Sequence, residues 1–120
     1  MSSDEHLHLD FAVHSAPLAD GGTEITIFGD LDLHTVRELR AALEPALADE
    51  GPIVIDLRAC PFVDSSGLGA LAGAAVRLDE RGRSLVIRGV GPRVLRTFQV
   101  AGIADRDSIT VEPGPTVPSH

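Results

Sequence analysis

Ile53-Val54-Ile55-Asp56-Leu57 leads through a short loop to Phe62-Val63-Asp64-Ser65-Ser66-Gly67-Leu68-Gly69. An almost wholly apolar run of this length is typical of a central strand that is covered on at least one face. The second segment opens a run of apolar residues with helical spacing, so we expect a strand, a loop and then a helix. The hydroxyl groups of Ser65 and Ser66 should therefore lie at the N-terminal end of that helix.

The start of a helix is a favourable place for a negative charge. Its first N–H groups have no partners within the helix, and the aligned peptide dipoles make this end partly positive. A phosphate on Ser65 or Ser66 would add about −1.5 to −2 charges at neutral pH, and the backbone there could accept it without loss of the helix. Asp64-Ser65-Ser66-Gly67 also has a purely structural interpretation, because Asp and Ser are preferred N-cap residues.

Two strands are predicted before this central unit. Apolar residues alternate with others from Leu7 to Val13, which is the period of a half-buried strand. Pro17 to Gly22 is rich in turn residues, and Thr23 to Gly29 has the composition of a strand. We expect these two strands to form an antiparallel hairpin with a long loop.

A first helix is predicted between the hairpin and the central strand. Thr35-Val36-Arg37-Glu38 matches the capping-box pattern, and apolar residues then follow helical spacing to about Asp49. Pro45 should bend or interrupt this helix, because proline lacks the backbone N–H that an inner turn needs. The elements expected after the central unit are a strand at Ser84 to Arg88, a helix from Pro92 to Gly102 and a short strand at Ser108 to Val111.

The resulting order, ββαβαβαβ, predicts a single α/β domain with a mixed β-sheet and helices packed against it. The domain should span residues 7–111. Residues 1–6 and 112–120 are expected to be flexible tails, the second because its proline content prevents regular packing. A chain of 120 residues leaves little room for a second domain.

The composition argues against several kinds of partner. The net charge is −8 and the ten Lys and Arg residues form no strong cluster, so nucleic acid and anionic membranes should be repelled. No apolar run reaches the ~20 residues that cross a bilayer, and the acidic start is unlike a signal peptide, so we expect a cytoplasmic protein. Cys60 is the only cysteine, which excludes an intramolecular disulfide and favours a role as a small apolar core residue.

Enzymatic and metal chemistry fit the sequence poorly. Ser66 lacks the Gly-x-Ser-x-Gly context of a nucleophile elbow. His6 and His8 have no third zinc ligand beside them. Carboxylates that could together bind Mg²⁺ are Asp30, Asp32, Asp56 and Asp64. We favour strand termination and loop solvation for these carboxylates, and we predict no catalytic residue, no metal site and no cofactor.

Two motifs occur in order and at the scale of a domain: Gly29-Asp30-Leu31-Asp32, followed by Thr35 and its helix, and then Phe62 to Gly69. With this combination the chain resembles the anti-sigma factor antagonists of the STAS domain family, over about residues 7 to 111. The resemblance implies a mixed sheet packed with helices. It also implies a binding protein in a switching cascade rather than an enzyme.

The same resemblance implies a mechanism. The unmodified protein would bind an anti-sigma factor that has a histidine-kinase-like ATPase fold, and would so release a sigma factor. That kinase would phosphorylate the second serine of the motif, Ser66, and end the binding, and a PP2C-type phosphatase would remove the phosphate. The implied partner contacts are Asp30, Asp32, Asp64, Ser65, Gly67 and Leu68.

Other functions stay open at this point. STAS domains also serve as subunits of lipid-transport complexes and as regulatory tails of anion transporters, so the chain could bind a transporter ATPase or a small ligand without phosphorylation. An independent hydrolase is a weaker third candidate. The sequence determines neither the sigma factor nor the oligomeric state.

Overall fold

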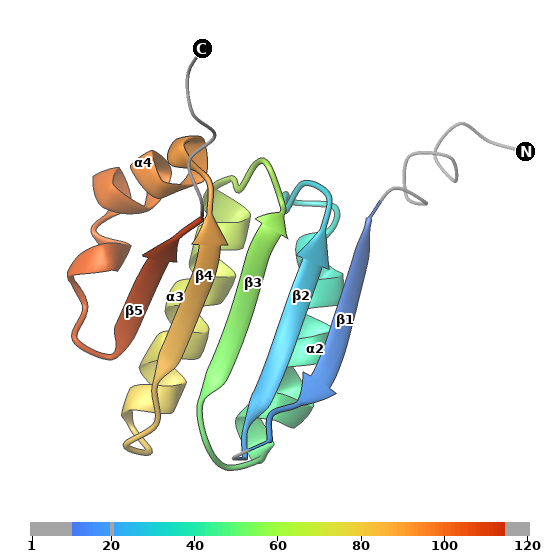
Figure 1. The fold of residues 1–120 in the computed structure, drawn as a ribbon, viewed down its shortest axis with the longest axis vertical. Helices are drawn as coiled ribbons and strands as arrows, with labels where there is room; N and C mark the ends of the chain where they lie inside the picture. The colour runs from blue at the N-terminus through green and yellow to red at the C-terminus, as the bar shows by residue number, and fades with distance from the viewer. Residues whose placement is uncertain (1–10, 20, 115–120) are drawn as a thin grey trace, which may run out of the picture.

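The computed structural model describes residues 11–19 and 21–114. In this part of the chain a five-stranded sheet has the strand order β1-β2-β3-β4-β5 (Figure 1). The strands are β1 (Ala12–Pro17), β2 (Thr23–Phe28), β3 (Ile53–Ala59), β4 (Leu85–Val90) and β5 (Ile109–Pro113). The β1 strand is antiparallel to β2, and all later pairs are parallel. The predicted mixed sheet and element order are confirmed.

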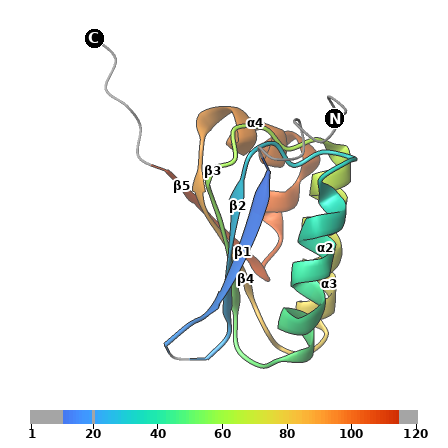
Figure 2. The same ribbon diagram turned by 90° about the vertical axis from the view of Figure 1, so that its right-hand side faces the viewer.

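Helices connect the parallel strands. The connecting elements are α2 (Val36–Ala48), α3 (Ser65–Asp79), α4 (Pro92–Ala101) and the short 3-10 helix η1 (Ile103–Asp105). The α2 and α3 helices lie side by side on one face of the sheet (Figure 2). None of the helices between residues 11 and 114 is both long and apolar enough to span a bilayer.

The hydrophobic core lies between the sheet and this helical layer. Alternate residues of the central strands, such as Ile25, Ile55 and Ile87, are fully buried against the helical layer. From the helices, Leu39 and Leu71 are buried against the sheet. The period of two in each strand and of 3.6 in each helix brings these apolar side chains together. The core therefore holds the loops at the carboxyl ends of β2 and β3 in fixed positions.

Within residues 11–19 and 21–114, no helix covers the other face of the sheet, which carries charged side chains. Arg88 of β4 forms ion pairs with Glu24 of β2 and with Asp56 of β3, and Arg58 lies 2.9 Å from the Asp56 carboxylate. Asp56 is only 2% exposed. A buried carboxylate is tolerated when charged partners satisfy it, so these side chains tie three neighbouring strands together.

The first strand lies later in the chain than predicted. It spans Ala12–Pro17 instead of residues 7–13, and residues 7–10 lie outside the described part. Leu18 and Gly22 close the hairpin with a hydrogen bond of 3.0 Å, which pairs Pro17 with Thr23. Because β1 is an edge strand, Pro17 can end it without the loss of a needed N–H donor. The predicted antiparallel hairpin itself is confirmed.

The last strand also extends beyond the predicted domain end at residue 111. Glu112 pairs with Arg88 and Pro113 pairs with Val90, so the first two residues of the expected tail belong to β5. Proline is tolerated there because β5 is the other edge of the sheet. The proline content predicted an irregular segment here, but pairing with β4 makes residues 112 and 113 part of a strand.

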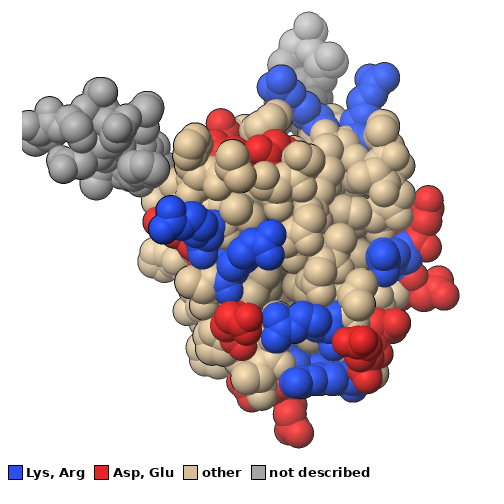
Figure 3. Space-filling view, turned by 180° about the vertical axis from the view of Figure 1, so that it is seen from behind, with Lys and Arg blue, Asp and Glu red and all other residues tan. Residues whose placement is uncertain are grey.

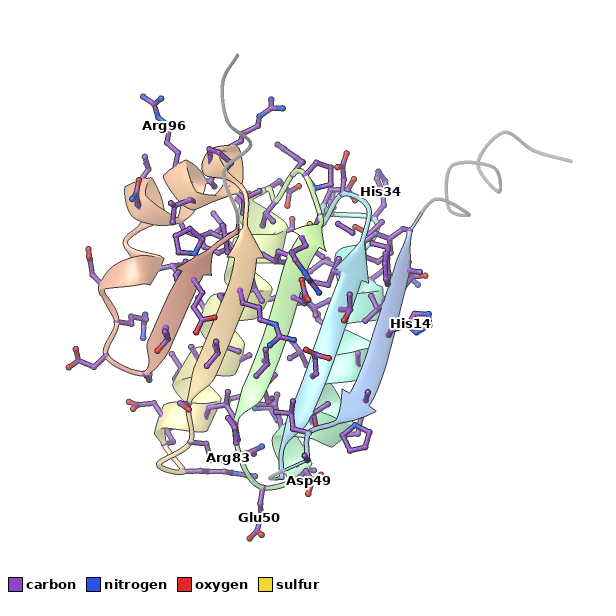
Figure 4. The ribbon with its side chains drawn as sticks, in the orientation of Figure 1. His14, His34, Asp49, Glu50, Arg83 and Arg96 are labelled. Atoms are coloured by element: carbon purple, nitrogen blue, oxygen red, sulfur yellow. The ribbon has the colours of Figure 1, made fainter. Side chains whose placement is uncertain are left out.

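Pro45 does not interrupt α2: the helix runs unbroken from Val36 to Ala48, so the restart that we gave as one alternative does not occur. Two arginines in the turn between α3 and β4 donate hydrogen bonds to the C-terminal end of α2. The Arg83 guanidinium donates to the carbonyl groups of Ala46, Leu47 and Gly51, each at 2.8 Å. Arg81 donates to Leu47 as well. Arg83 lies near Asp49 and Glu50 at this end of the molecule (Figure 4).

We expect Arg83→Ala to lower the free energy of unfolding by about 1 kcal/mol, because three backbone carbonyls at and just after the end of α2 lose a charged donor. Chemical denaturation of the wild type and the variant measures the change. Arg83→Lys keeps the charge but not the three-pronged geometry, and should recover less than half of the loss. Full recovery by lysine would show that charge, and not the hydrogen-bond geometry, stabilises this end.

Candidate functional site

The two sequence motifs meet at the carboxyl ends of β2 and β3. Leu31 and Val63 form an isolated parallel bridge between the loops that carry them. The Leu31 N–H donates to the Phe62 carbonyl at 2.9 Å, and the Asp64 N–H donates to the Leu31 carbonyl at 3.0 Å. Leu31 and Val63 are both buried. The loop at residues 29–35 and the loop at residues 60–64 therefore form one connected surface next to the start of α3.

Asp64 caps α3. Its Oδ1 atom accepts hydrogen bonds from the N–H groups of Ser66 at 2.8 Å and Gly67 at 3.1 Å. Ser65 and Ser66 are then the first two residues of the helix, as the sequence predicted. The Asp64 carboxylate already accepts from these two N–H groups, so a phosphate could take them only by displacing Asp64. A phosphate on Ser66 would instead lie beside a fixed negative charge.

Gly67 allows the first turn of α3 to approach the two loops. An added Cβ atom at this position would lie 2.8 Å from side-chain carbons of both Leu31 and Val63. These contacts are shorter than carbon atoms tolerate. At Gly69 and Gly73 an added Cβ would meet nothing within 4 Å. Only Gly67 among these three is required by close packing.

Asp32 organises the first of the two loops. Its Oδ1 atom accepts from the N–H groups of His34 at 2.9 Å and Thr35 at 3.0 Å. The Thr35 hydroxyl donates to the Asp30 carbonyl at 2.7 Å and accepts from the Asp32 N–H at 2.9 Å. The predicted capping box at Thr35 is wrong, since this hydroxyl is used within the loop and makes no cap bond to α2. The interpretation of Asp32 as a loop-forming residue is confirmed.

The hydrogen bonds of this loop shift the pKa of the Asp32 carboxyl. Burial acts to raise its pKa, but the hydrogen bonds from Thr35 and His34 outweigh burial and lower the pKa below its ordinary value of 3.8. Asp56 is shifted in the same direction, because the hydrogen bonds and charge of Arg58 outweigh burial.

Stability should therefore fall in acid. A carboxyl whose pKa is lowered by folding stabilises the folded state above its unfolded pKa, and this contribution is lost as the pH falls through the lower folded value. We expect the free energy of unfolding, measured by denaturant titration, to decrease as the pH is lowered below about 4. Asp32→Asn keeps an oxygen acceptor and should make this decrease shallower; an unchanged slope would contradict the assignment to Asp32.

Beyond the Asp64 cap, the outer face of α3 is largely apolar and uncharged. Ser65 is exposed, whereas Ser66 and Leu68 are partly buried. No charged residue occurs from residue 65 to residue 76. Figure 3, which shows the helical face, has charged side chains mainly at its rim and lower part, with a broad uncharged area between. Patches of this kind are typical of protein interaction sites.

Two exposed apolar side chains extend this surface, and neither is among the site residues predicted from the sequence. Leu33 is 66% exposed and Phe62 is 39% exposed, and each lies in one of the two motif loops. The Arg93 guanidinium of α4 lies 5.9 Å from the centre of the Phe62 ring. The sequence did contain one signal for an exposed apolar residue: Leu33 stands between Asp32 and His34 in a short loop, where it is difficult to bury.

The remaining candidate residues do not join the site. Asp56 pairs with arginines on the uncovered face, so the four carboxylates form no cluster, and residues 11–19 and 21–114 contain no group of three or more potential metal ligands. His6 and His8 lie outside the described residues. Cys60 is buried, which raises the pKa of its thiol to about 11, and its Sγ donates to the Phe62 carbonyl at 3.3 Å.

This fold and the paired motif loops define a known class of domain. The family model described as "Mlab, STAS domain" matches residues 14–112, and the chain belongs to the STAS domain family. An anti-sigma-B factor antagonist from Listeria monocytogenes is 35% identical over 83 residues, which are 68% of this chain and 73% of that protein.

Solved structures agree on the fold. An anti-sigma factor antagonist from Mycobacterium paratuberculosis superimposes with a TM-score of 0.74 at 24% identity, covering 89% of this chain and 87% of the other. The Bacillus cell fate determinant SpoIIAA, in its phosphorylated form, superimposes with a TM-score of 0.67 at 24% identity, covering 83% of this chain and 90% of the other.

Proposed function

We propose that this protein is an anti-sigma factor antagonist, and that it acts in the cytoplasm as a binding protein rather than an enzyme. The observation that carries the proposal is the surface at the start of α3, where the serine pair adjoins an uncharged helix face and two exposed apolar residues, Leu33 and Phe62. A relative that is 35% identical to this chain over 83 residues is an anti-sigma-B factor antagonist. The partner would be an anti-sigma factor with a histidine-kinase-like ATPase fold.

Phosphorylation of Ser66 is the switch in this proposal. Ser66 is the second residue of α3 and is partly buried beside the Asp64 carboxylate. A phosphate there would bring charge and bulk into the contact surface, and no cation of the described chain forms an ion pair with Asp64 or Asp32 to offset it. The partner kinase would add the phosphate, and a PP2C-type phosphatase would remove it. SpoIIAA is a relative in fold with a phosphorylated form.

The remaining predicted contacts have unequal roles. Asp64, Asp32 and Gly67 are used mainly to build the site, through the cap, the loop and the close packing described above. Asp30, Ser65 and Leu68 have surface available to a partner. We assign partner contact to this second group together with Leu33 and Phe62.

Affinity capture from a lysate of the native organism tests the function. Wild type, Ser66→Ala and Ser66→Asp are immobilised, bound proteins are identified by mass spectrometry, and phosphate is mapped on the recovered wild type. We expect a kinase-fold anti-sigma factor with the wild type and the alanine variant but not with the aspartate variant, and phosphate on Ser66. Recovery of transporter subunits with all three proteins would instead favour the alternative of a STAS subunit that binds a transporter ATPase.

A further inference from the structure

A concave site lies between the carboxyl ends of β3 and β4 and the start of α4, and neither Ser65 nor Ser66 lines it. Its volume is about 390 Å³, which is within the range of small-molecule sites, ~300–1,000 Å³. The exposed Pro61 contributes apolar surface, with the almost wholly buried Leu57 and Val94 behind it, and Arg58 and Arg93 line the cavity as well. The function proposed above makes no use of this cavity.

The cavity is positive although the whole protein is negative, and Arg93 supplies the net charge because Asp56 balances that of Arg58. The chain has a net charge of −8, yet the described residues that line this cavity include two arginines and no carboxylate. The start of α4 adds to the positive potential of the two guanidinium groups. A hollow with apolar walls and cationic side chains complements an organic anion better than a cation or a neutral molecule.

Arg58 is held in place before any ligand arrives, and Arg93 is free of competing carboxylates. Arg58 donates from its Nε and Nη2 atoms to the buried Asp56 carboxylate, which leaves Nη1 without a partner among the described residues. Arg93 lies over the Phe62 ring and forms no ion pair with a carboxylate in the same part of the chain. Side chains that are already ordered lose less entropy when a ligand binds.

We propose that this cavity binds a small organic anion, in which a phosphate or carboxylate head group is joined to a short apolar body. Arg93 and the free Nη1 of Arg58 contact the head group, and the apolar body lies against Leu57, Pro61 and Val94. Neither serine lines the cavity, but Arg93 lies over Phe62, which is assigned above to partner contact, so the cavity adjoins the proposed partner surface.

Titration of the ¹⁵N-labelled protein with hexyl phosphate, followed by NMR, tests this site. We expect saturable shifts of the backbone amides of Gly89, Gly91 and Gly114, which line the cavity. Inorganic phosphate lacks the apolar body and hexanol lacks the charge, so each should bind at least about tenfold more weakly. A parallel titration with hexanoate distinguishes a phosphate site from a carboxylate site. Equal binding of hexanol, or no saturable shift at these amides with either anion, would overturn the proposal.

Two matched variants on α4 distinguish a specific contact of Arg93 from the general effect of a positive charge on this helix. Arg93→Gln removes a head-group donor and should weaken hexyl phosphate binding about tenfold, the effect of one charge-assisted hydrogen bond. Arg96→Gln makes the same charge change on the same helix, but Arg96 points away from the sheet (Figure 4) and does not line the cavity. It should bind as the wild type does. Equal effects of the two variants would show general electrostatic attraction and contradict the site.

A variant that fills the cavity tests the site without a change of charge. An added Cβ at Gly91 meets no atom within 4 Å, and the φ angle there is −69°, so a larger side chain is compatible with the backbone. Gly91→Leu should abolish the saturable shifts while the rest of the NMR spectrum stays folded. Undiminished binding by this variant would place the anion elsewhere and overturn the proposal.

Discussion

Ser66→Asp is expected to weaken binding to the purified anti-sigma factor at least about 100-fold, equivalent to about 2.7 kcal/mol. The added carboxylate would lie beside Asp64, whose own carboxylate is fixed by the Ser66 and Gly67 N–H groups and cannot withdraw without uncapping α3. Partner binding would have to desolvate both negative charges, which is costly at an interface. Calorimetric titration measures the affinity.

The effect of Ser66→Asp should appear in binding and not in folding. We expect its thermal unfolding to remain close to that of the wild type, because the position is at the start of a helix, where a negative charge also gains from the helix dipole. Ser65→Ala and Ser66→Ala should both bind within a few-fold of the wild type. Ser84→Asp provides a charge-matched control, since Ser84 is exposed and lies just before β4, at the other end of that strand from the site. A large fall in melting temperature for Ser66→Asp would count against the switch.

Gly67→Ala is expected to destabilise the fold by about 1–3 kcal/mol, although alanine is normally the better helix former. The new methyl group would lie 2.8 Å from carbons of Leu31 and Val63. Neither can move aside freely, because both are buried and the bridge between them joins the two motif loops. The strain should therefore move the start of α3 and weaken partner binding as well.

Gly69→Ala is the matched control for this prediction. It changes the same residue type in the same helix, but an added Cβ there meets nothing within 4 Å. This substitution should stabilise the protein by about 0.5–1 kcal/mol, since alanine loses less backbone entropy than glycine when the helix forms. Denaturant unfolding of both variants measures the difference. A stabilising Gly67→Ala would refute the close packing that we assign to this turn.

The sequence predicted the central part of the fold well because the deciding signals there are local. The apolar run at residues 53–57 and the helix that follows Asp64 depend on side-chain period and on a single cap. Pro92 at the first turn of α4 and Gly102 at its end, where φ is +75°, are equally local. Such features need no knowledge of the rest of the chain.

The prediction failed where a neighbour across the sheet decides the outcome. Pro17 and Pro113 have the composition of turns and tails, yet each ends an edge strand because the adjacent strand offers it a partner. Thr35 matches a capping box, but its hydroxyl bonds within the loop that Asp32 organises. In each case the tertiary structure supplies a hydrogen-bond or strand partner that the local sequence pattern does not reveal.

The sequence by itself determined the order of the elements, the family resemblance and the place of Ser66 at the start of a helix, because these follow from motifs read along the chain. Only the tertiary structure showed that Asp64 holds the backbone donors beside Ser66 and that Gly67 is needed for contact with Leu31 and Val63. It alone placed Arg58 and Arg93 around one cavity. These facts depend on distances between residues far apart in the chain, which are set when the sheet and its helices bury a common core.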